Sequence, residues 1–201
     1  MSDKCSISDK GGVTNILMAG VGGQGTLLAS EILSEVLMQG GYDVKKAEVH
    51  GMAQRGGSVV SHVRFGPKVY SSIIPEGDAD VLFGFELLET YRYLSLVKKS
   101  GTVIVNNLRI APPSVALGVA EYPEDIESKL GDYVDNVRVV NGLELAEQAG
   151  NPRTVNTVLL GALSRTLAPS HEQWVAAIKA LVPERFLEVN LNAFELGRKV
   201  D

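Results

Sequence analysis

A glycine-rich turn constrains the fold of this chain more than any other stretch of its sequence. An apolar run at residues 16–19 is followed by GVGGQG at residues 20–25, and apolar side chains then recur at helical spacing from Thr26 onward. This order predicts a buried strand, a tight turn and a helix. Gly20, Gly22 and Gly25 also fit the G-x-G-x-x-G pattern of phosphate-binding turns.

The predicted turn suits an anionic ligand. The first N–H groups of a helix lack partners within the helix, and the helix dipole makes this end positive, so both favour a phosphate. The alternative is a glycine turn that only packs the helix on the strand. The candidate binding residues of this turn are Gly20, Gly22, Gly23, Gln24, Gly25 and Thr26.

A second candidate loop follows a predicted strand at residues 42–49 and reads HGMAQRGGS, residues 50–58. Its candidate binding residues are His50, Gln54, Arg55 and Ser58. They donate hydrogen bonds to anions or amides, and the loop leaves the carboxyl end of a strand, where binding sites of α/β folds lie. The planar guanidinium of Arg55 suits a phosphate or a carboxylate. His50 is equally well explained as a structural histidine.

Glu48, at the end of the same strand, keeps a dinucleotide-binding interpretation open. In a βαβ dinucleotide-binding unit, an acidic residue about 20 residues beyond the glycines holds the ribose hydroxyls. The alternative is a polar residue that leaves a strand. The sequence does not choose between the two.

The remaining pattern predicts an α/β fold of Rossmann-like layers. Alternating residues at 59–65 and a return at 69–74 predict an added antiparallel β-hairpin, whereas apolar runs at 81–85, 102–106 and 137–140 predict further strands of a mostly parallel sheet. Helices are predicted at 86–98 and over the C-terminal part, where Trp174 is a core or subunit-contact residue. The strand at 102–106 ends with Asn106 at a carboxyl edge. Gly150 predicts a helix stop, Asn151–Pro152 a helix start, and Ser170 with Gln173 a capping box. The double proline at 112–113 predicts a segment without helix.

Composition excludes several functional classes. The net charge of −5 and the lack of a basic tract argue against nucleic acid as a partner and against a membrane surface. No apolar run approaches the length of a membrane span, so a cytoplasmic protein is expected. The single cysteine, Cys5, cannot build an iron–sulfur or zinc site, and no metal site is predicted. We expect residues 1–14 to be a flexible tail and residues 15–201 to form one domain.

Five segments together carry a resemblance to a known family. They are GVGGQG at 20–25, EVHGMAQRGGSV at 48–59, SHVRFG at 61–66, IPEGDADVLFGFELLE at 74–89 and NTVLLGAL at 156–163. In this order they resemble the gamma-type subunits of the 2-oxoacid:ferredoxin oxidoreductases. Within that family, the segments HVRFG at 62–66 and VYSSIIPEGDAD at 69–80 are most similar to the beta subunit of indolepyruvate:ferredoxin oxidoreductase. Residues 15–201 would then be a pyruvate/ketoisovalerate oxidoreductase gamma-type domain.

The resemblance implies a subunit that is inactive alone. In this family a larger partner subunit carries thiamine diphosphate and iron–sulfur clusters, decarboxylates the 2-oxoacid and passes electrons to ferredoxin. The gamma-type subunit is implicated in handling CoA, which makes CoA a candidate ligand of the glycine turn. No cofactor is assigned to this chain alone, no catalytic residue is assigned, and self-association stays open.

Other functions remain in view. The substrate could be 2-oxoglutarate or pyruvate in place of indolepyruvate, because the aromatic preference rests on the resemblance alone. An independent NAD-dependent dehydrogenase would use Gly20–Gly25 and Glu48. A third alternative is a noncatalytic scaffold whose glycine loops only shape a subunit contact.

Overall fold

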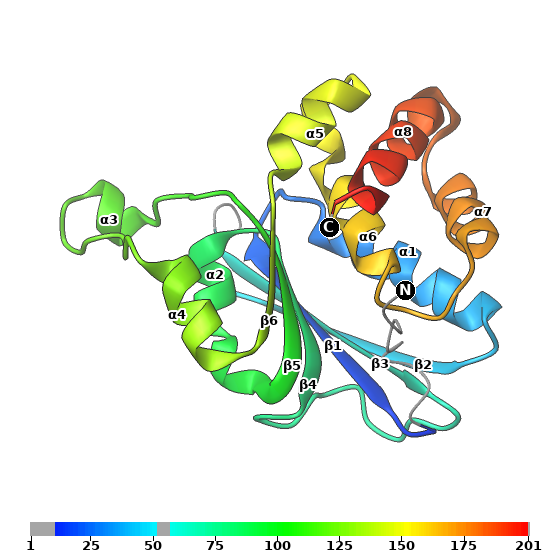
Figure 1. The fold of residues 1–201 in the computed structure, drawn as a ribbon, viewed down its shortest axis with the longest axis horizontal. Helices are drawn as coiled ribbons and strands as arrows, with labels where there is room; N and C mark the ends of the chain where they lie inside the picture. The colour runs from blue at the N-terminus through cyan, green and yellow to red at the C-terminus, as the bar shows by residue number, and fades with distance from the viewer. Residues whose placement is uncertain (1–10, 52–56, 201) are drawn as a thin grey trace.

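The chain folds around one six-stranded sheet with helices on both faces (Figure 1). In the computed structural model, residues 11–51 and 57–200 are described. The strand order is β2-β3-β1-β4-β5-β6. The bounds of the strands are β1 (Thr14–Val21), β2 (Asp43–His50), β3 (Ser58–Gly66), β4 (Ala79–Gly84), β5 (Val97–Asn106) and β6 (Asn136–Val140).

Most of the sheet is parallel, as predicted. β1, β4, β5 and β6 pair in parallel, whereas β3 lies antiparallel between β1 and β2. β1 is buried along its whole length because helices cover both faces of the sheet, which explains its continuous apolar run. The carboxyl ends of the parallel strands therefore meet at one edge, where the glycine turn begins.

The predicted hairpin exists, but with another partner strand. β3 was expected to pair with residues 69–74, whereas it pairs with β2 on one side and β1 on the other. Both edges of β3 are then occupied, so residues 69–74 cannot pair with it. They are held instead by side chains of the hairpin: Asp43 accepts from the N–H of Val69 (3.0 Å), and His62 Nδ1 accepts from the N–H of Ile74 (3.2 Å).

Helices pack on the sheet in two groups. One face carries α1 (Thr26–Gln39), α5 (Gly142–Ala149), α6 (Val155–Ser164), α7 (His171–Leu181) and α8 (Leu187–Arg198). The other face carries α2 (Leu87–Arg92) and α4 (Ile126–Tyr133). A short α3 (Pro113–Ala116) lies apart from both groups. The 3₁₀ turns within the described residues are η2 (Leu94–Leu96), η3 (Pro152–Thr154) and η4 (Glu184–Phe186).

The larger helical layer owes its close packing to glycine. A Cβ on Gly197 of α8 would lie 1.9 Å from the carbonyl oxygen of Val158 in α6, and a Cβ on Gly161 of α6 would lie 2.2 Å from that of Phe194. The two backbones are thus nearly in contact, which only glycine allows. Trp174 of α7 is fully buried and stacks on Phe194 at 5.7 Å, so its predicted place in the core is confirmed.

Two helix predictions were wrong in their extent. The helix expected at residues 86–98 ends at Arg92, because β5 starts at Val97 to pair with β4. The double proline does not prevent helix, since Pro113 occupies the first turn of α3, where a missing N–H is tolerated.

The first strand begins close to the predicted domain boundary. β1 starts at Thr14, one residue before the predicted domain boundary, and residues 1–10 lie outside the described part of the chain. Among the described residues, no helix has the length and apolar character needed to cross a bilayer.

Candidate functional site

The glycine turn connects β1 to α1 as predicted and adopts conformations that favour glycine. Gly23 and Gly25 have φ angles of 100° and 77°, in the left-handed region. Gly25 is the N-cap of α1, and within the described residues this helix start has no side-chain cap hydrogen bond. The N-terminus of α1 therefore keeps backbone N–H groups available to an anion.

Other residues of the turn serve its shape. Gln24 Oε1 accepts from the N–H of Val21 (2.6 Å), and Gln24 Nε2 donates to the carbonyl of Phe85 (3.0 Å), so both ends of this amide are engaged. A Cβ on Gly20 would lie 2.9 Å from Gln24 Oε1 and from Phe85 Cβ. Close packing of the turn thus accounts for Gly20, and Gln24 links the ends of β1 and β4.

Thr26 is buried at the start of α1, and its Oγ1 has no hydrogen-bond partner in the described part of the chain. The hydroxyl lies against the glycine turn, 3.2 Å from the place of a Cβ on Gly20. A small change in the conformation of the turn could give this hydroxyl a hydrogen-bond partner.

The turn lies at the point where the sheet changes its winding direction. β1 continues into α1 on one face, and its neighbour β4 continues into α2 on the opposite face. Because the connections diverge there, a crevice opens outside the carboxyl ends of the two strands, which is where ligands bind in open α/β sheets.

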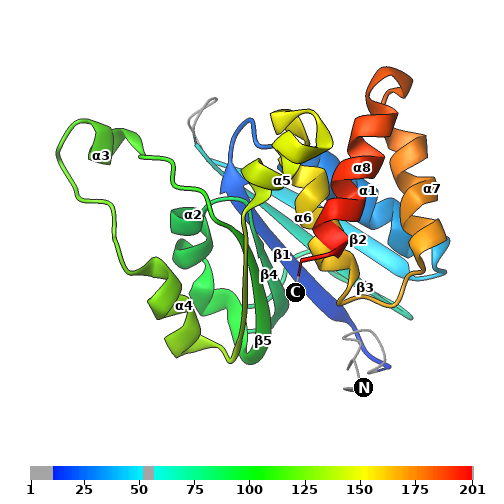
Figure 2. The same ribbon diagram turned by 45° about the horizontal axis from the view of Figure 1, so that its top comes forward.

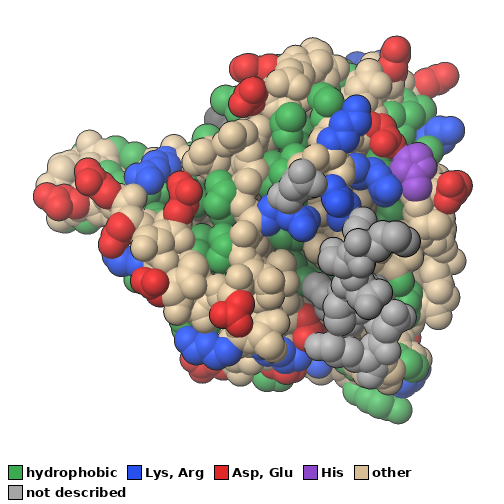
Figure 3. Space-filling model, viewed as in Figure 1, with side chains coloured by type: hydrophobic (Ala, Val, Ile, Leu, Met, Phe, Trp, Pro, Cys, Tyr) green, Lys and Arg blue, Asp and Glu red, His purple; other side chains and the backbone are tan. Residues whose placement is uncertain are grey.

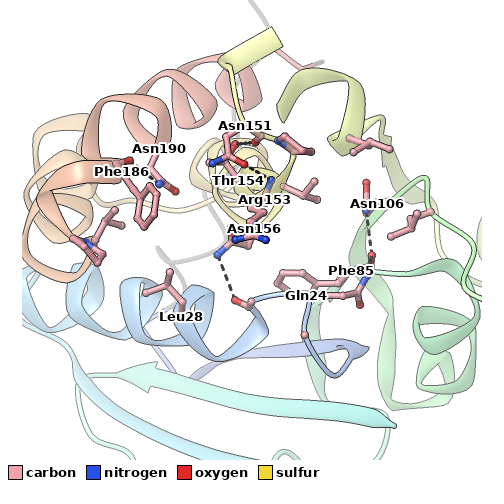
Figure 4. A pocket seen from close by; sticks show the side chains of 18 residues that line it. Gln24, Leu28, Phe85, Asn106, Asn151, Arg153, Thr154, Asn156, Phe186 and Asn190 are labelled. Atoms are coloured by element: carbon pink, nitrogen blue, oxygen red, sulfur yellow. Dashed lines mark hydrogen bonds between the residues drawn. The ribbon is translucent and has the colours of Figure 1, made fainter. Parts of the chain in front are cut away.

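A cavity of about 560 Å³ occupies this crevice on the α1 side (Figure 4). Gly23, Gln24 and Gly25 form one wall, and the ends of β4 and β5 contribute Phe85 and Asn106. The remaining walls come from α1, from α5, from the segment after β5, from the segments around η3 and η4, and from α8. Apolar side chains prevail in them, and most of these are named here: Leu28, Leu108, Leu143, Val155, Val182 and Phe186.

Arg153 is the only charged residue among the described residues that line this cavity. Its backbone N–H donates to Asn151 Oδ1 (2.9 Å), as part of the cap that opens η3. Its guanidinium is exposed and has neither a hydrogen bond nor an ion pair within the described residues. An unpaired guanidinium near a helix N-terminus favours a phosphate or a carboxylate.

Asparagines complete the polar part of the cavity. Asn156 approaches the glycine turn, its Nδ2 lying 3.5 Å from the carbonyl oxygen of Gly25 (Figure 4). Asn106 donates to the carbonyl of Phe85 (3.2 Å) and accepts from the N–H of Gly142 (3.1 Å), so its amide is used to join β4, β5 and α5. The long contact of Asn156 leaves it the better hydrogen-bonding partner for a ligand.

Ser58 lies on the other side of the crevice. It lines a second hollow of about 280 Å³, on the α2 face, together with Glu89 and Arg92. Its hydroxyl lies 3.2 Å from the hydroxyl of Tyr93. The two loops do meet, because the N–H of Gly22 donates to the carbonyl of Gly57 (2.9 Å). The structure thus brings the predicted loops together but directs Ser58 away from the larger cavity.

The other predicted residues of the second loop are described in part or not at all. The backbone of His50 ends β2 opposite Val59, and its side chain is outside the described set. Gln54 and Arg55 lie outside the described residues, so their roles stay predictions.

Glu48 does not occupy the place of a ribose-binding acid. β3 separates β2 from β1, so the end of β2 is not adjacent to the glycine turn as in a dinucleotide-binding unit. Glu48 instead accepts from Ser30 Oγ (3.2 Å) and pairs with Lys46 Nζ (3.1 Å). The dehydrogenase alternative loses its supporting residue.

Sequence reasoning missed Arg153 and Asn156 as cavity residues. The Asn151–Pro152 cap was recognised as a helix start, and Asn106 was recognised at a carboxyl edge, but nothing local connects either segment with the glycine turn. No group of three or more metal-ligating side chains occurs in the described part of the chain.

Comparison with known proteins places these features in context. The sequence matches the family described as pyruvate ferredoxin/flavodoxin oxidoreductase over residues 15–200. The indolepyruvate oxidoreductase subunit IorB of Thermococcus kodakarensis is 44% identical over 190 residues, which cover 92% of this chain and 94% of that protein. The 2-oxoglutarate synthase subunit KorC of Methanothermobacter thermautotrophicus is 31% identical, with coverages of 92% and 93%.

Solved structures share the fold. The gamma subunit of a keto/oxoacid ferredoxin oxidoreductase from Geobacter sulfurreducens has a TM-score of 0.67 at 25% identity and matches 92% of this chain and 95% of its own. A 2-oxoglutarate:ferredoxin oxidoreductase from Magnetococcus marinus, solved with 2-oxoglutarate, coenzyme A and succinyl-CoA, has a TM-score of 0.72 at 20% identity. The match covers 94% of this chain but only 31% of that longer chain.

Proposed function

The chain belongs to the pyruvate ferredoxin/flavodoxin oxidoreductase family, and on this premise we propose that it is the smaller subunit of an indolepyruvate:ferredoxin oxidoreductase. The observation that carries the proposal is the 44% identity to an IorB subunit over nearly the full length of both chains, against 31% to a KorC subunit. The alternative substrate 2-oxoglutarate is thus the less favoured one.

The proposed reaction needs more than this chain. An aryl 2-oxoacid and CoA yield an acyl-CoA, carbon dioxide and a proton, and two electrons pass to two ferredoxins. We assign thiamine diphosphate and iron–sulfur clusters to a larger partner subunit, which would supply the decarboxylation and the electron transfer. This chain contributes a binding site next to that centre.

CoA is the ligand that we propose for the cavity. CoA joins negatively charged phosphates to a long and mostly uncharged pantetheine arm. The cavity has matching parts, since the N-terminus of α1 and Arg153 suit phosphates, whereas Leu28, Leu143 and Phe186 suit the arm. Its volume of about 560 Å³ is in the range of small-molecule sites.

Steady-state kinetics of the reconstituted complex test this function. We expect indolepyruvate to be oxidised faster than 2-oxoglutarate or pyruvate in a CoA-dependent viologen assay. Arg153→Ala should raise the KM for CoA by about 10- to 100-fold with little change in kcat, as expected for a lost hydrogen bond to a charged group. Arg153→Lys should recover part of the affinity.

Lys179→Ala is the matched control, because it removes an exposed cation of α7 that does not line the cavity. Faster turnover of 2-oxoglutarate would refute the assigned substrate. An unchanged KM for CoA in Arg153→Ala would refute the assigned binding site and leave the subunit assignment intact.

A further inference from the structure

An arm of residues 109–124 projects from the carboxyl edge of the sheet, between β5 and α4, and carries α3 near its tip (Figure 2). Side chains from residue 113 to residue 121 are exposed, apart from a half-buried Val115. Two of them are large and apolar: Leu117 and Val119 are each 79% exposed. Contiguous exposed apolar patches mark contact sites for other proteins, and the arm presents two large apolar side chains close together in the chain.

The base of the arm is held by a buried carboxylate. Glu86, which is only 1% exposed, caps the start of α2 by accepting from the N–H of Glu89 (2.8 Å). Its Oε1 accepts from the N–H of Ile110 (3.0 Å) and from the hydroxyl of Tyr122 (2.5 Å). These two residues lie in the outgoing and the returning leg of the arm. One carboxylate therefore joins both legs to the body of the protein.

Further bonds shape the arm itself. Arg109 Nη2 donates to the carbonyl of Glu124 (3.0 Å), which links the legs a second time. At the tip, the carbonyl of Ser114 accepts from the N–H groups of Val119 (2.8 Å) and Ala120 (3.1 Å). Burying a carboxylate costs free energy unless donors satisfy it. The N–H groups of Glu89 and Ile110 and the hydroxyl of Tyr122 offset this cost. The anchored arm keeps its tip away from the core of the chain.

The partner has to offer an apolar recess with a basic rim. Glu121, Glu124 and Glu127 are exposed on the returning leg and at the start of α4, and Figure 3 shows acidic side chains over this projection. Asp125 is also exposed, but it already pairs with Lys129 (2.8 Å). The same fold makes up only 31% of the longer Magnetococcus chain, so in that protein it is joined to further domains within one polypeptide. The IorB relatives are named as subunits, so the partner of this fold in their complexes is a separate chain.

We propose that the arm docks into an apolar, basic-rimmed recess of the larger subunit, an inference that rests on the proposed function. Leu117 and Val119 fill the recess, and the acidic residues of the returning leg pair with its rim. The arm leaves the same edge of the sheet as the glycine turn, so docking also places the cavity beside the partner.

Co-expression with the larger subunit tests the proposal. The double variant Leu117→Asp/Val119→Asp should lower the amount of co-purified larger subunit at least about tenfold, because two apolar side chains lose their burial. Leu117→Ser/Val119→Ser should act in the same direction without added charge. The unfolding temperature of the free chain should stay unchanged, since neither side chain is buried in it.

Tyr70→Asp is the control, because Tyr70 is 90% exposed and lies between β3 and β4, at the opposite edge of the sheet. A photo-crosslinking residue at position 117 should capture the larger subunit. Capture of a second copy of this chain alone, or unchanged co-purification of both double variants, would refute the docking site. If the unmodified chain binds no larger subunit, the proposed function itself has failed.

Discussion

Replacing Tyr122 by phenylalanine tests whether Glu86 holds the arm. The change removes the hydroxyl that donates to Glu86 Oε1 (2.5 Å) and that accepts from the N–H of Leu88 (3.2 Å). Burial and the neighbouring carboxylate raise the pKa of Tyr122, so it is a neutral donor at every pH of interest. The ring and its packing stay in place.

The expected loss of stability follows from these contacts. A hydrogen bond to a charged group contributes about 1.5–3 kcal/mol, and an N–H left without an acceptor costs about 1 kcal/mol or more. Glu86 keeps its two backbone donors, Ile110 and Glu89, so its carboxylate is not left unpaired. We therefore expect a loss of about 2 kcal/mol, which corresponds to about 4–8 °C in Tm for a domain of this size.

Guanidinium unfolding followed by circular dichroism measures this loss, and hydrogen exchange of residues 108–124 shows whether the arm loosens. Tyr133→Phe is the matched control, since the Tyr133 hydroxyl has no hydrogen bond in the described part of the chain, and it should change stability by less than about 0.5 kcal/mol. A loss below about 0.5 kcal/mol for Tyr122→Phe, with unchanged exchange in the arm, would refute the role assigned to Glu86.

Three further substitutions test the fold and the cavity. Gly25→Ala should destabilise the chain by about 1–3 kcal/mol and weaken CoA binding, because it strains a left-handed residue and places a Cβ 2.9 Å from Asn156. An unchanged CoA affinity in titration calorimetry would contradict this. Gly197→Ala should cost about 3 kcal/mol in urea unfolding, because its Cβ would meet the Val158 carbonyl at 1.9 Å, and a neutral result would disprove the close contact of α6 and α8. Burial, and then the neighbouring Arg64, lower the pKa of His62. As the pH drops below about 6.5, the unfolded chain therefore takes up the proton first, and the stability of the folded chain should fall. His62→Asn should flatten this dependence in unfolding curves measured from about pH 7 to 5.

Local signals in the sequence predicted those features that neighbouring residues decide. The strand–turn–helix at residues 16–26 depends on apolar spacing and on glycines with positive φ, and the structure has it as predicted. Ser170 and Gln173 form the capping box of α7, and Gly150 ends α5 with a left-handed φ of 108°. Each of these patterns involves residues within one or two turns of one another, so their physics can be read along the chain.

The mostly parallel α/β sheet could also be predicted, because strands alternate with helices over most of the chain. The pairing of β3 could not. Residues 69–74 have a strand-like composition, but whether they pair depends on which edges of β3 remain free, and β1 and β2 occupy both. Strand propensity describes one segment at a time and carries no information about its neighbours in the sheet.

The sequence by itself thus determined the glycine turn, the order of most elements and the family resemblance. Only the tertiary structure decided what the turn faces. It brings Arg153 and Asn156 to the turn from far along the chain, and it directs Ser58 to the opposite side of the crevice. The physical reason is that a binding cavity is formed by the packing of distant segments, whereas turns and caps are formed by hydrogen bonds between close neighbours in the chain.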